Sequence, residues 1–478
     1  MLRHLSFGFL LMGCFLLTSC GGSTNTTTLK SGVPMSLTIG DTPPNGVAVL
    51  FFESLITGAS LQPSDSTKPA VSVLSSPVEV EFAHLQTDTA FLHFENVAPD
   101  TYKSMTLTFG NPVMTIVNHS GAAMGSCANN AVCEMKPTFN PSSATISTMP
   151  FPITLDANSV VGIRLDFNLN SSVQSDLSIN PVVTISHFRQ RQDSDDSMEM
   201  EQIDEVDGEV TGTGSGQFTL MNERSGQSFT INVDSNTVFE DFDRSGCMKT
   251  PADISCVVSG QILEVTLREN GSGTMLAKRV EFEENANKAA IKGTITSVDS
   301  ATQFHMVVFN EEPGVAGIAE GSPVVVTINS GAIFQIGREE MGDDGGFSMS
   351  GFSFASGADL LVGQDVQIRP GAASTSGGVT TVPTDLVRLW PSQISGQVGM
   401  INTTNGTFPL TGLSPLFTGA TPPVTTINVM TLSGMDFMDF SGFGSLTPGS
   451  KVSIRGLLFN TTGTPTLVTR AMREDNGV

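Results

Sequence analysis

Aromatic residues that carry a polar atom are almost absent from this chain. Its 478 residues include 30 phenylalanines but a single tryptophan, Trp390, and a single tyrosine, Tyr102. Sugar-binding modules typically present exposed tryptophan or tyrosine rings, which combine an apolar body with a polar tip. Transmembrane β-barrels need aromatic girdles at both membrane interfaces. The composition therefore argues against a pore and leaves only two rings that could serve as a sugar platform.

Positive charge is also scarce. Lys and Arg number 23 against 47 Asp and Glu, which gives a net charge of −24 at pH 7. Nucleic-acid binding takes much of its affinity from basic side chains that release counterions. Electrostatic docking onto an anionic lipid surface has the same requirement. We therefore expect no nucleic-acid partner, and any membrane attachment has to come from another source than charge.

Long helical heptads are missing as well. Val, Ile, Thr and Phe recur instead in short alternating runs, and Gly, Pro, Asn and Asp separate these runs. This pattern is typical of many short antiparallel strands. We predict an all-β protein, with an N-terminal two-sheet β-sandwich followed by three small β-barrel repeats.

The long apolar run of the chain lies at its N-terminus. The apolar residues Leu5–Leu17 lead directly into Leu17-Thr18-Ser19-Cys20. This segment resembles the bacterial lipobox, and the resemblance implies that Cys20 becomes the first mature residue and is acylated. The run is shorter than the about 20 apolar residues of a transmembrane helix. Two alternatives are a plain secretory signal and an earlier lipobox that ends at Cys14.

A lipid on Cys20 would determine where the protein resides. Two or more acyl chains anchor a protein stably, whereas a single chain binds only marginally. Gly21 stands where an Asp often marks retention in the inner membrane of enteric bacteria. We therefore predict a lipid-anchored protein of the bacterial cell envelope, held at the outer membrane.

The remaining cysteines form two pairs that are close in the sequence. Cys127 and Cys133 are one pair, and Cys247 and Cys256 are the other. In an oxidising exported compartment such pairs are expected to form small loop-closing disulfides. The alternative is a four-cysteine zinc site, although zinc ligands within a pair usually have only two to four residues between them.

Composition also divides the chain into segments. We predict a lipoprotein signal peptide (1–19), a flexible tether (20–32), a β-sandwich domain (33–188), an acidic linker (189–205) and three β-barrel repeats (206–284, 289–391 and 392–475). The linker is dense in Asp and Glu, which is typical of a solvated connection. Weak cation binding by this segment is the alternative.

Several motifs of the first domain are similar to known sandwiches. Val97-Ala-Pro-Asp-Thr-Tyr102 leads into Met105-Thr-Leu-Thr-Phe109, and this arrangement resembles the Gly-Thr-Tyr corner of transthyretin-like and immunoglobulin-like sandwiches, with Asp100 where those often have Gly. Together with Ser36–Pro43, Leu55–Leu61 and Leu165–Asn168, it resembles a family of bacterial lipoprotein domains, domain of unknown function 4382. The resemblance covers about a third of the chain and implies a fold but no chemistry.

Beyond the linker the sequence repeats three times. Three glycines share the pattern apolar-x-Gly-x-apolar, namely Gly208, Gly293 and Gly396. Three more begin the pattern Gly-x-x-apolar-x-apolar, namely Gly260, Gly363 and Gly449. Such units predict small closed barrels that are broadly similar to OB-folds, and they resemble a second bacterial family, domain of unknown function 5666. Because the units are acidic and poor in Trp and Tyr, the usual OB-fold ligands are not implied.

The clearest candidate for a metal site is a partial calcium loop. Asp241, Asp243 and Ser245 place oxygen atoms at alternating positions, and Gly246 occupies the sixth position. The twelfth position is Ala252, where calcium loops have a bidentate Glu. We therefore treat this segment as a weak calcium candidate and expect no resident cofactor.

No catalytic constellation is recognisable. Gly212-Thr-Gly-Ser-Gly216 has its serine one position away from that of a nucleophile elbow, which indicates a hairpin turn. The acids of the insertion 337–357, namely Glu339, Glu340, Asp343 and Asp344, lie in a Gly-rich stretch that predicts a loop. His84 and His93 fall on adjacent strand segments, and two histidines alone make a poor metal site.

The sequence thus predicts a cellular location and a domain architecture. We expect a non-enzymatic envelope module for structure, adhesion or ligand binding, with its domains arranged as beads on a lipid tether. Its partners would be the membrane, through the N-terminal lipid, and an unknown protein or glycan. The alternative is an envelope carbohydrate-binding protein or hydrolase whose site is assembled from loops, and exposure of Tyr102 or Trp390 beside carboxylates would favour it.

Overall fold

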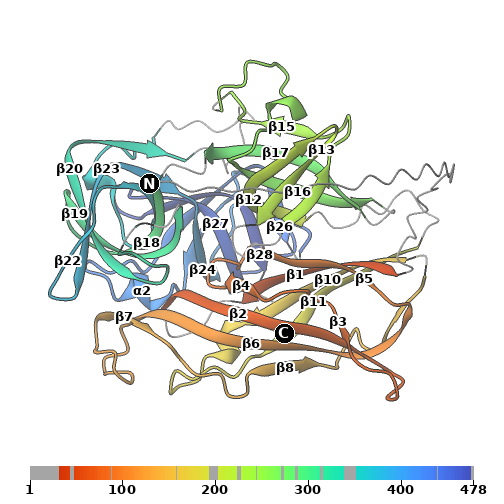
Figure 1. Cartoon of the computed structure of the whole chain (residues 1–478). Helices are drawn as coiled ribbons and strands as arrows, with labels where there is room; N and C mark the ends of the chain where they lie inside the picture. The colour runs from red at the N-terminus through yellow and green to blue at the C-terminus, as the bar shows by residue number, and fades with distance from the viewer. Residues whose placement is uncertain are drawn as a thin grey trace, which may run out of the picture. The chain divides into compact units, whose positions relative to one another are not determined.

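The computed structural model is built almost wholly from β-strands (Figure 1), which confirms the predicted class of a sandwich followed by barrels. It describes residues 32–474 except for 43–47, 88, 158, 193–202, 223–227, 244, 271–273, 286–288, 313–314, 316, 338–350 and 439. Cys20, the signal peptide and most of the tether and the acidic linker lie outside the described residues. Among the residues described, no helix is long and apolar enough to cross a membrane.

The N-terminal domain is a sandwich of two sheets. One sheet has the order β11-β10-β1-β5, formed by Val183–Gln192, Ser159–Asn168, Val33–Thr42 and Ala90–Val97. The other has the order β3-β2-β6-β7, formed by Val71–Ser72, Ala48–Pro63, Asp100–Asn118 and Ala131–Met135. Strand β4 (Val78–Glu81) pairs with β2, while β8 (Ser143–Ile146) and β9 (Ile153–Leu155) pair with β6.

Phenylalanine fills the space between these two sheets. The rings of Phe52, Phe82 and Phe167 contact one another, with centroids 4.6–5.7 Å apart. Tyr102 is fully buried, and its hydroxyl donates a 2.8 Å hydrogen bond to the carbonyl oxygen of Ala98. This bond to the backbone a few residues upstream is the geometry of a tyrosine corner, and it explains how a phenol can be buried without losing its polar partner.

The three repeats form three similar five-stranded barrels. The first comprises β12 (Ile203–Gly214), β13 (Gln217–Asn222), β14 (Ser228–Asn232), β16 (Gln261–Asn270) and β17 (Thr274–Asn285), with β15 (Val238–Glu240) at its side. The second comprises β18 (Ala290–Ser300), β19 (Gln303–Glu312), β20 (Pro323–Ile336), β21 (Asp365–Pro370) and β23 (Val379–Trp390), with β22 (Ser374–Ser376) beside β23. The third comprises β24 (Ser392–Val398), β25 (Thr407–Thr411), β26 (Ile427–Met438), β27 (Lys451–Phe459) and β28 (Thr466–Glu474). In each barrel the third strand closes the sheet by pairing in parallel with the last one.

The repeated glycines have the same structural role in every barrel. A Cβ atom on Gly208, Gly293 or Gly396 would lie only 2.5–2.7 Å from a backbone oxygen of the neighbouring strand. The second set of glycines has φ values of +84°, +81° and +97°, a region that favours glycine. The backbone N–H groups of this second set donate to carbonyl oxygens in the first strands, on Val210, Ile295 and Val398. Each barrel therefore needs glycine at two positions, one for close approach and one for a left-handed turn.

The domains pack against one another within residues 32–478, which form one unit. Arg473 in the last strand of barrel 3 donates to a side-chain oxygen of Asp166 (3.2 Å) and to the carbonyl oxygen of Asp41 (3.0 Å), both in the sandwich. The backbone N–H of Gln86 donates to the Gln393 side chain of barrel 3 at 2.9 Å. This packing is absent from the sequence-based prediction, which treats the domains as beads on a tether.

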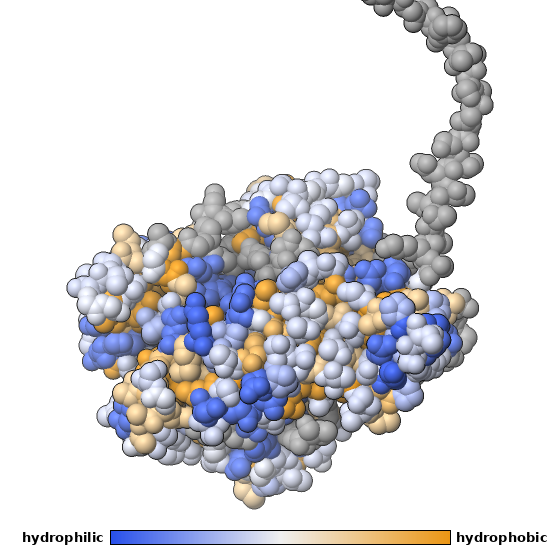
Figure 2. All heavy atoms as spheres, turned by 60° about the horizontal axis from the view of Figure 1, so that its bottom comes forward, coloured by the Kyte–Doolittle hydropathy of each residue, from blue (hydrophilic) through white to orange (hydrophobic). Residues whose placement is uncertain are grey.

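Hydrophobic and hydrophilic residues are mixed on the face of the molecule shown in Figure 2. The most exposed large hydrophobic residues are Met149, Met248 and Met400, which come from the sandwich, barrel 1 and barrel 3. Single exposed hydrophobic residues are normal on protein surfaces, so these three residues do not by themselves mark a functional site.

Candidate functional site

A cavity of about 410 Å³ lies where the four domains meet. The sandwich contributes strands β2, β4 and β5 and the loop after β4, and all three barrels contribute further lining residues. Nine lining residues are acidic, whereas three are Lys or Arg. The acidic ones are Glu53, Glu79, Glu81, Asp207, Glu264, Glu283, Glu311, Glu320 and Asp365. The volume falls in the range of small-molecule sites, and the lining is strongly negative.

One part of the lining is a buried hydrogen-bond network between the sandwich and barrel 2. Glu81 accepts hydrogen bonds from the backbone N–H groups of Phe52 and Ala83, both at 3.0 Å, and lies 2.8 Å from Nδ1 of His84. Because Nδ1 faces a carboxylate, it carries the proton that it donates. Nε2 of His84 then points toward Thr294 Oγ1, at 3.5 Å.

The network ends on a second carboxylate. The Thr294 hydroxyl donates a 2.6 Å hydrogen bond to Asp365. Burial raises the pKa of Asp365 to about 6, although the charge of His84 and the hydrogen bond from Thr294 oppose the rise. The order carboxylate, histidine, hydroxyl is that of a nucleophilic site. Here, however, the hydroxyl is buried and already donates to Asp365, so the contacts bind two domains together.

A second part of the lining brings three carboxylates together. Glu53 lies in β2 and Glu79 in the neighbouring β4, while Glu320 belongs to the loop before β20 in barrel 2. Burial, together with the charges of Glu79 and Glu320 and hydrogen bonds to them, raises the pKa of Glu53 to about 8. At neutral pH this cluster therefore holds a proton on Glu53.

The loop that carries Glu320 is anchored in the sandwich. The Thr115 hydroxyl donates a buried 2.6 Å hydrogen bond to the carbonyl oxygen of Gly321. Gly321 has a φ of +79°, and a Cβ atom there would lie 2.8 Å from the ring of Phe51. Only glycine fits this contact, so the position of Glu320 beside Glu53 is fixed by the packing of the two domains.

The single tryptophan also lines the cavity. Trp390 is 7% exposed, and Nζ of Lys292 lies 4.3 Å from the centroid of its ring, a cation–π contact. Tyr102 lies in the sandwich core and is fully buried. Neither of these two rings forms an exposed platform for a sugar.

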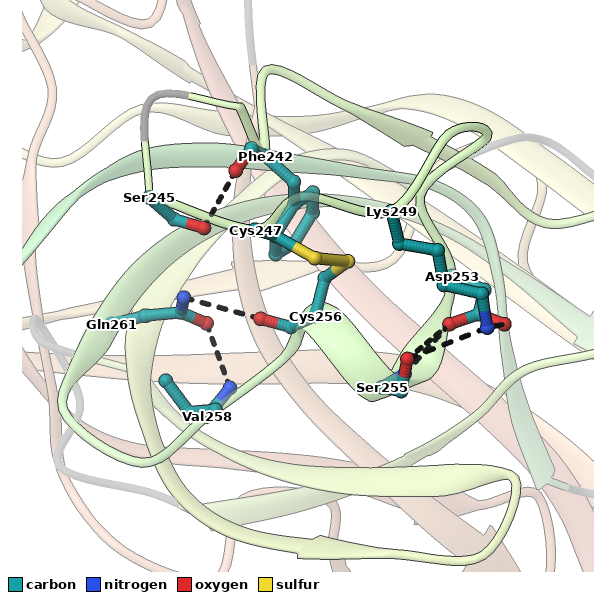
Figure 3. The surroundings of a disulfide bond; sticks show 9 residues. All are labelled: Phe242, Ser245, Cys247, Lys249, Asp253, Ser255, Cys256, Val258 and Gln261. Atoms are coloured by element: carbon teal, nitrogen blue, oxygen red, sulfur yellow. Dashed lines mark hydrogen bonds and ion pairs between the residues drawn. A yellow bond between two sulfur atoms is a disulfide. The ribbon is translucent and has the colours of Figure 1, made fainter.

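Both predicted cysteine pairs lie at disulfide distance. The Cα atoms of Cys127 and Cys133 are 5.7 Å apart, and those of Cys247 and Cys256 are 5.5 Å apart, with their sulfur atoms bonded. Figure 3 shows the second bond beside the ring of Phe242. Cysteines paired in this way offer no thiolate to zinc.

The calcium candidate folds as a turn with its own hydrogen bonds. The Ser245 hydroxyl donates to the carbonyl oxygen of Phe242 at 2.7 Å (Figure 3), and the N–H of Gly246 donates to the carbonyl oxygen of Asp243 at 3.1 Å. Asp241 has a φ of +56° at the start of this turn. In the part of the chain that the structure describes, no group of three or more His, Cys, Asp or Glu side chains is arranged to hold a metal ion.

The first barrel has a known relative. Residues 207–281 match the family model of a domain of unknown function, DUF5666. This match confirms the predicted resemblance for the first repeat, while the resemblance of the sandwich to domain of unknown function 4382 stays a prediction. No curated protein matches the chain.

Among solved structures, the chain is similar to a multidomain protein with nucleic acid binding domains from Streptococcus pneumoniae TIGR4. The identity is 8%, the match covers 55% of this chain and 72% of that one, and the TM-score is 0.11. A score this low carries no argument about fold or function.

Proposed function

We propose that this protein is a lipid-anchored, non-enzymatic module of the bacterial cell envelope that binds a small ligand in the cavity between its four domains. The proposal rests on one observation, namely that residues from the sandwich and from all three barrels line that cavity. Domains that acted only as spacers would not need to form a shared cavity lined with charged residues. Sites at domain interfaces are frequent places for ligands.

The structure of the lining supports binding rather than catalysis. The carboxylates of Glu81 and Asp365 are engaged in hydrogen bonds that join the sandwich to barrel 2. A hydrolase needs a nucleophile or an activated water that can reach the substrate, whereas Thr294 is buried and already donates its hydroxyl proton to Asp365. An enzymatic role for this protein remains the alternative to our proposal.

The anchor can be tested in cells. Full-length protein is expressed in a bacterium fed a fatty-acid probe, with Cys20→Ala as the variant and Cys14→Ala as the matched control. We expect the wild-type protein and Cys14→Ala to take up the probe and to sediment with membranes, and Cys20→Ala to do neither. Equal labelling of all three proteins would refute acylation at Cys20.

The ligand site can be tested through the single tryptophan. Because Trp390 lies in the cavity wall, its fluorescence reports occupancy without any added label. The full chain in detergent is titrated with classes of small solutes, namely amines, sugars, amino acids and organic acids. A saturable change with one class supports the proposal, and the absence of any saturable change across all classes contradicts it.

A further inference from the structure

His84 lies at the contact between the sandwich and barrel 2, in the loop that follows β4. Its Nδ1 atom is 2.8 Å from the carboxylate of Glu81, and the side chains of these two residues are 19% and 2% exposed. Glu81 also accepts the backbone N–H groups of Phe52, Ala83 and His84. Hydrogen bonds of this kind favour the ionised form of a carboxyl group. Nδ1 therefore carries a proton and faces a buried negative charge.

The hydrogen bonds of Thr294 determine the protonation of the other ring nitrogen. At pH 7 the carboxyl group of Asp365 is an acceptor, since burial raises its pKa only to about 6. Thr294 has one hydroxyl proton and donates it to Asp365 at 2.6 Å. Its oxygen can then only accept from Nε2 of His84, which lies 3.5 Å away. A ring that donates from both nitrogens is an imidazolium, so His84 is a cation in this arrangement.

The surroundings of the ring favour this cation. The ring of His84 lies against that of Phe309, with centroids 4.1 Å apart, and a positive charge over an aromatic face is favourable. Of the charged residues that line the cavity, those on the elements packed against His84 are Glu53, Glu79, Glu81, Lys292, Glu311 and Asp365. All of these except Lys292 are acidic. Arg388 and Arg455, which line the cavity from β23 and β27, have the opposite effect, but both charged partners in the hydrogen-bond network are carboxylates.

Loss of one proton from the ring changes this contact. A neutral His84 keeps its Nδ1–H for Glu81 but presents a lone pair at Nε2 to the hydroxyl of Thr294. Thr294 cannot donate its single proton to both Nε2 and Asp365, so one buried acceptor loses its donor. The two buried carboxylates also lose the cation between them. Both changes are unfavourable, because buried acceptors and charges are stable only when they are paired.

We propose that His84 is a pH-sensitive link, which holds the sandwich on barrel 2 while it is an imidazolium and releases this contact when it loses a proton at higher pH. A free imidazole changes charge near about pH 6.5, and neighbouring carboxylates favour the cation. The stabilisation is therefore present at neutral pH and is lost as the pH rises. Because His84, Glu81 and Asp365 line the cavity, release would also change the wall of the proposed ligand site. Only this last consequence rests on the proposed function.

The charge of the ring can be measured directly. The full chain in detergent is labelled with ¹⁵N at histidine, and the ring nitrogen signals are recorded by NMR at pH 7. The signals that His84→Gln removes belong to His84. We expect both of its ring nitrogens to carry a proton at pH 7, and a neutral ring at this pH would overturn the proposal.

Trp390 reports the opening of the contact, because it pairs with Asp365 across β21 and β23 and is 7% exposed. Quenching of its fluorescence by acrylamide is measured between about pH 7 and pH 9, the range in which the link should titrate. All proteins carry Glu53→Gln, since burial raises the pKa of Glu53 to about 8 and this group would titrate in the same range. With His84 present, we expect quenching to increase with pH. The opening equilibrium should rise by up to about tenfold per pH unit, because opening releases one proton.

Two histidine variants make a matched comparison. His84→Gln has no charge to lose, so the rise in quenching should disappear. His305→Gln makes the same change in the exposed pair with Asp299 of barrel 2 and should keep the rise. If His84→Gln does not fold, Asp365→Asn removes one of the two carboxylates and should make the rise smaller.

The outcomes separate this inference from the proposed function. Quenching that does not change with pH would overturn the link, and so would a rise that His84→Gln or Asp365→Asn leaves unchanged. These measurements need no ligand, so their failure leaves the binding function in place. Conversely, a protein that binds none of the solutes could still show the pH-dependent opening, and the link would then stand without the ligand site.

Discussion

The contact between the last strand and the sandwich gives the most quantitative prediction. Arg473 and Asp166 form an ion pair whose side chains are only 8% and 7% exposed. Burial, reinforced by the charge of Asp166, holds the pKa of Asp41 well above its usual range. The guanidinium of Arg473 donates to the carboxylate of Asp166 and to the backbone carbonyl oxygen of Asp41.

The perturbation is Arg473→Met, which keeps the length of the side chain and removes the guanidinium. It takes the guanidinium from the buried carboxylate of Asp166 and the donor from the carbonyl oxygens of Asp41 and Gln86. Breaking a buried pair by removing one partner costs about 3–5 kcal/mol. We expect the free energy of unfolding to fall by that amount in urea titrations followed by circular dichroism.

Two further variants test the reasoning behind this value. Arg369→Met removes the guanidinium from the exposed pair with Asp385, where water and salt screen the charges, and should leave the free energy of unfolding nearly unchanged. Asp166→Asn in the Arg473→Met background removes the stranded charge and should restore part of the stability. If Arg473→Met costs no more than Arg369→Met, or if the double variant is no more stable than the single one, the buried ion pair does not connect the domains as described.

Other substitutions should separate the remaining contributions to stability. Gly293→Ala should lower the free energy of unfolding by about 1–3 kcal/mol in the same urea assay, because its Cβ would clash with a backbone oxygen of β19. Gly58 has open space around it, so Gly58→Ala should not destabilise the protein. The raised pKa of Asp365 stabilises the folded protein below about pH 4, and this stabilisation, about 3 kcal/mol, is lost as the pH rises to about 6. Asp365→Asn should flatten this part of the curve of unfolding free energy against pH. An unchanged curve would contradict the raised pKa. Replacing Cys247 and Cys256 together by Ser should lower stability by about 2–3 kcal/mol, and an unchanged unfolding midpoint would show that this loop does not constrain the unfolded chain.

Much of the fold could be predicted because it depends on local pattern. Alternation such as Val78-Glu-Val-Glu-Phe82 reports a strand with one buried face, and the repeated glycines report close approach and turn geometry that no other residue tolerates. Tyr102 and the cysteine pairs also interact with residues near them in the sequence, so their contacts follow from short spacings.

The candidate site could not be predicted in the same way. Glu81 stands at an outward position of its strand, where alternation indicates solvent, yet it is buried and bonded to His84, whose ring reaches Thr294 of barrel 2. Glu53 and Glu320 are 267 positions apart and meet only because Gly321 docks against the sandwich. A motif search sees residues that are close in the chain, whereas this cavity joins residues from four separate domains. The signal that sequence reasoning missed was the presence of glutamates at outward strand positions in an unusually acidic chain.

The location of Arg473 in the final strand also has a consequence for biogenesis. A ribosome releases the N-terminal sandwich long before residue 473 emerges, so the nascent sandwich carries Asp166 without Arg473 until β28 has been made. Any fragment truncated ahead of β28 would have the same defect and should be cleaved more readily by proteases. The ion pair thus makes the stability of the sandwich depend on the synthesis of β28.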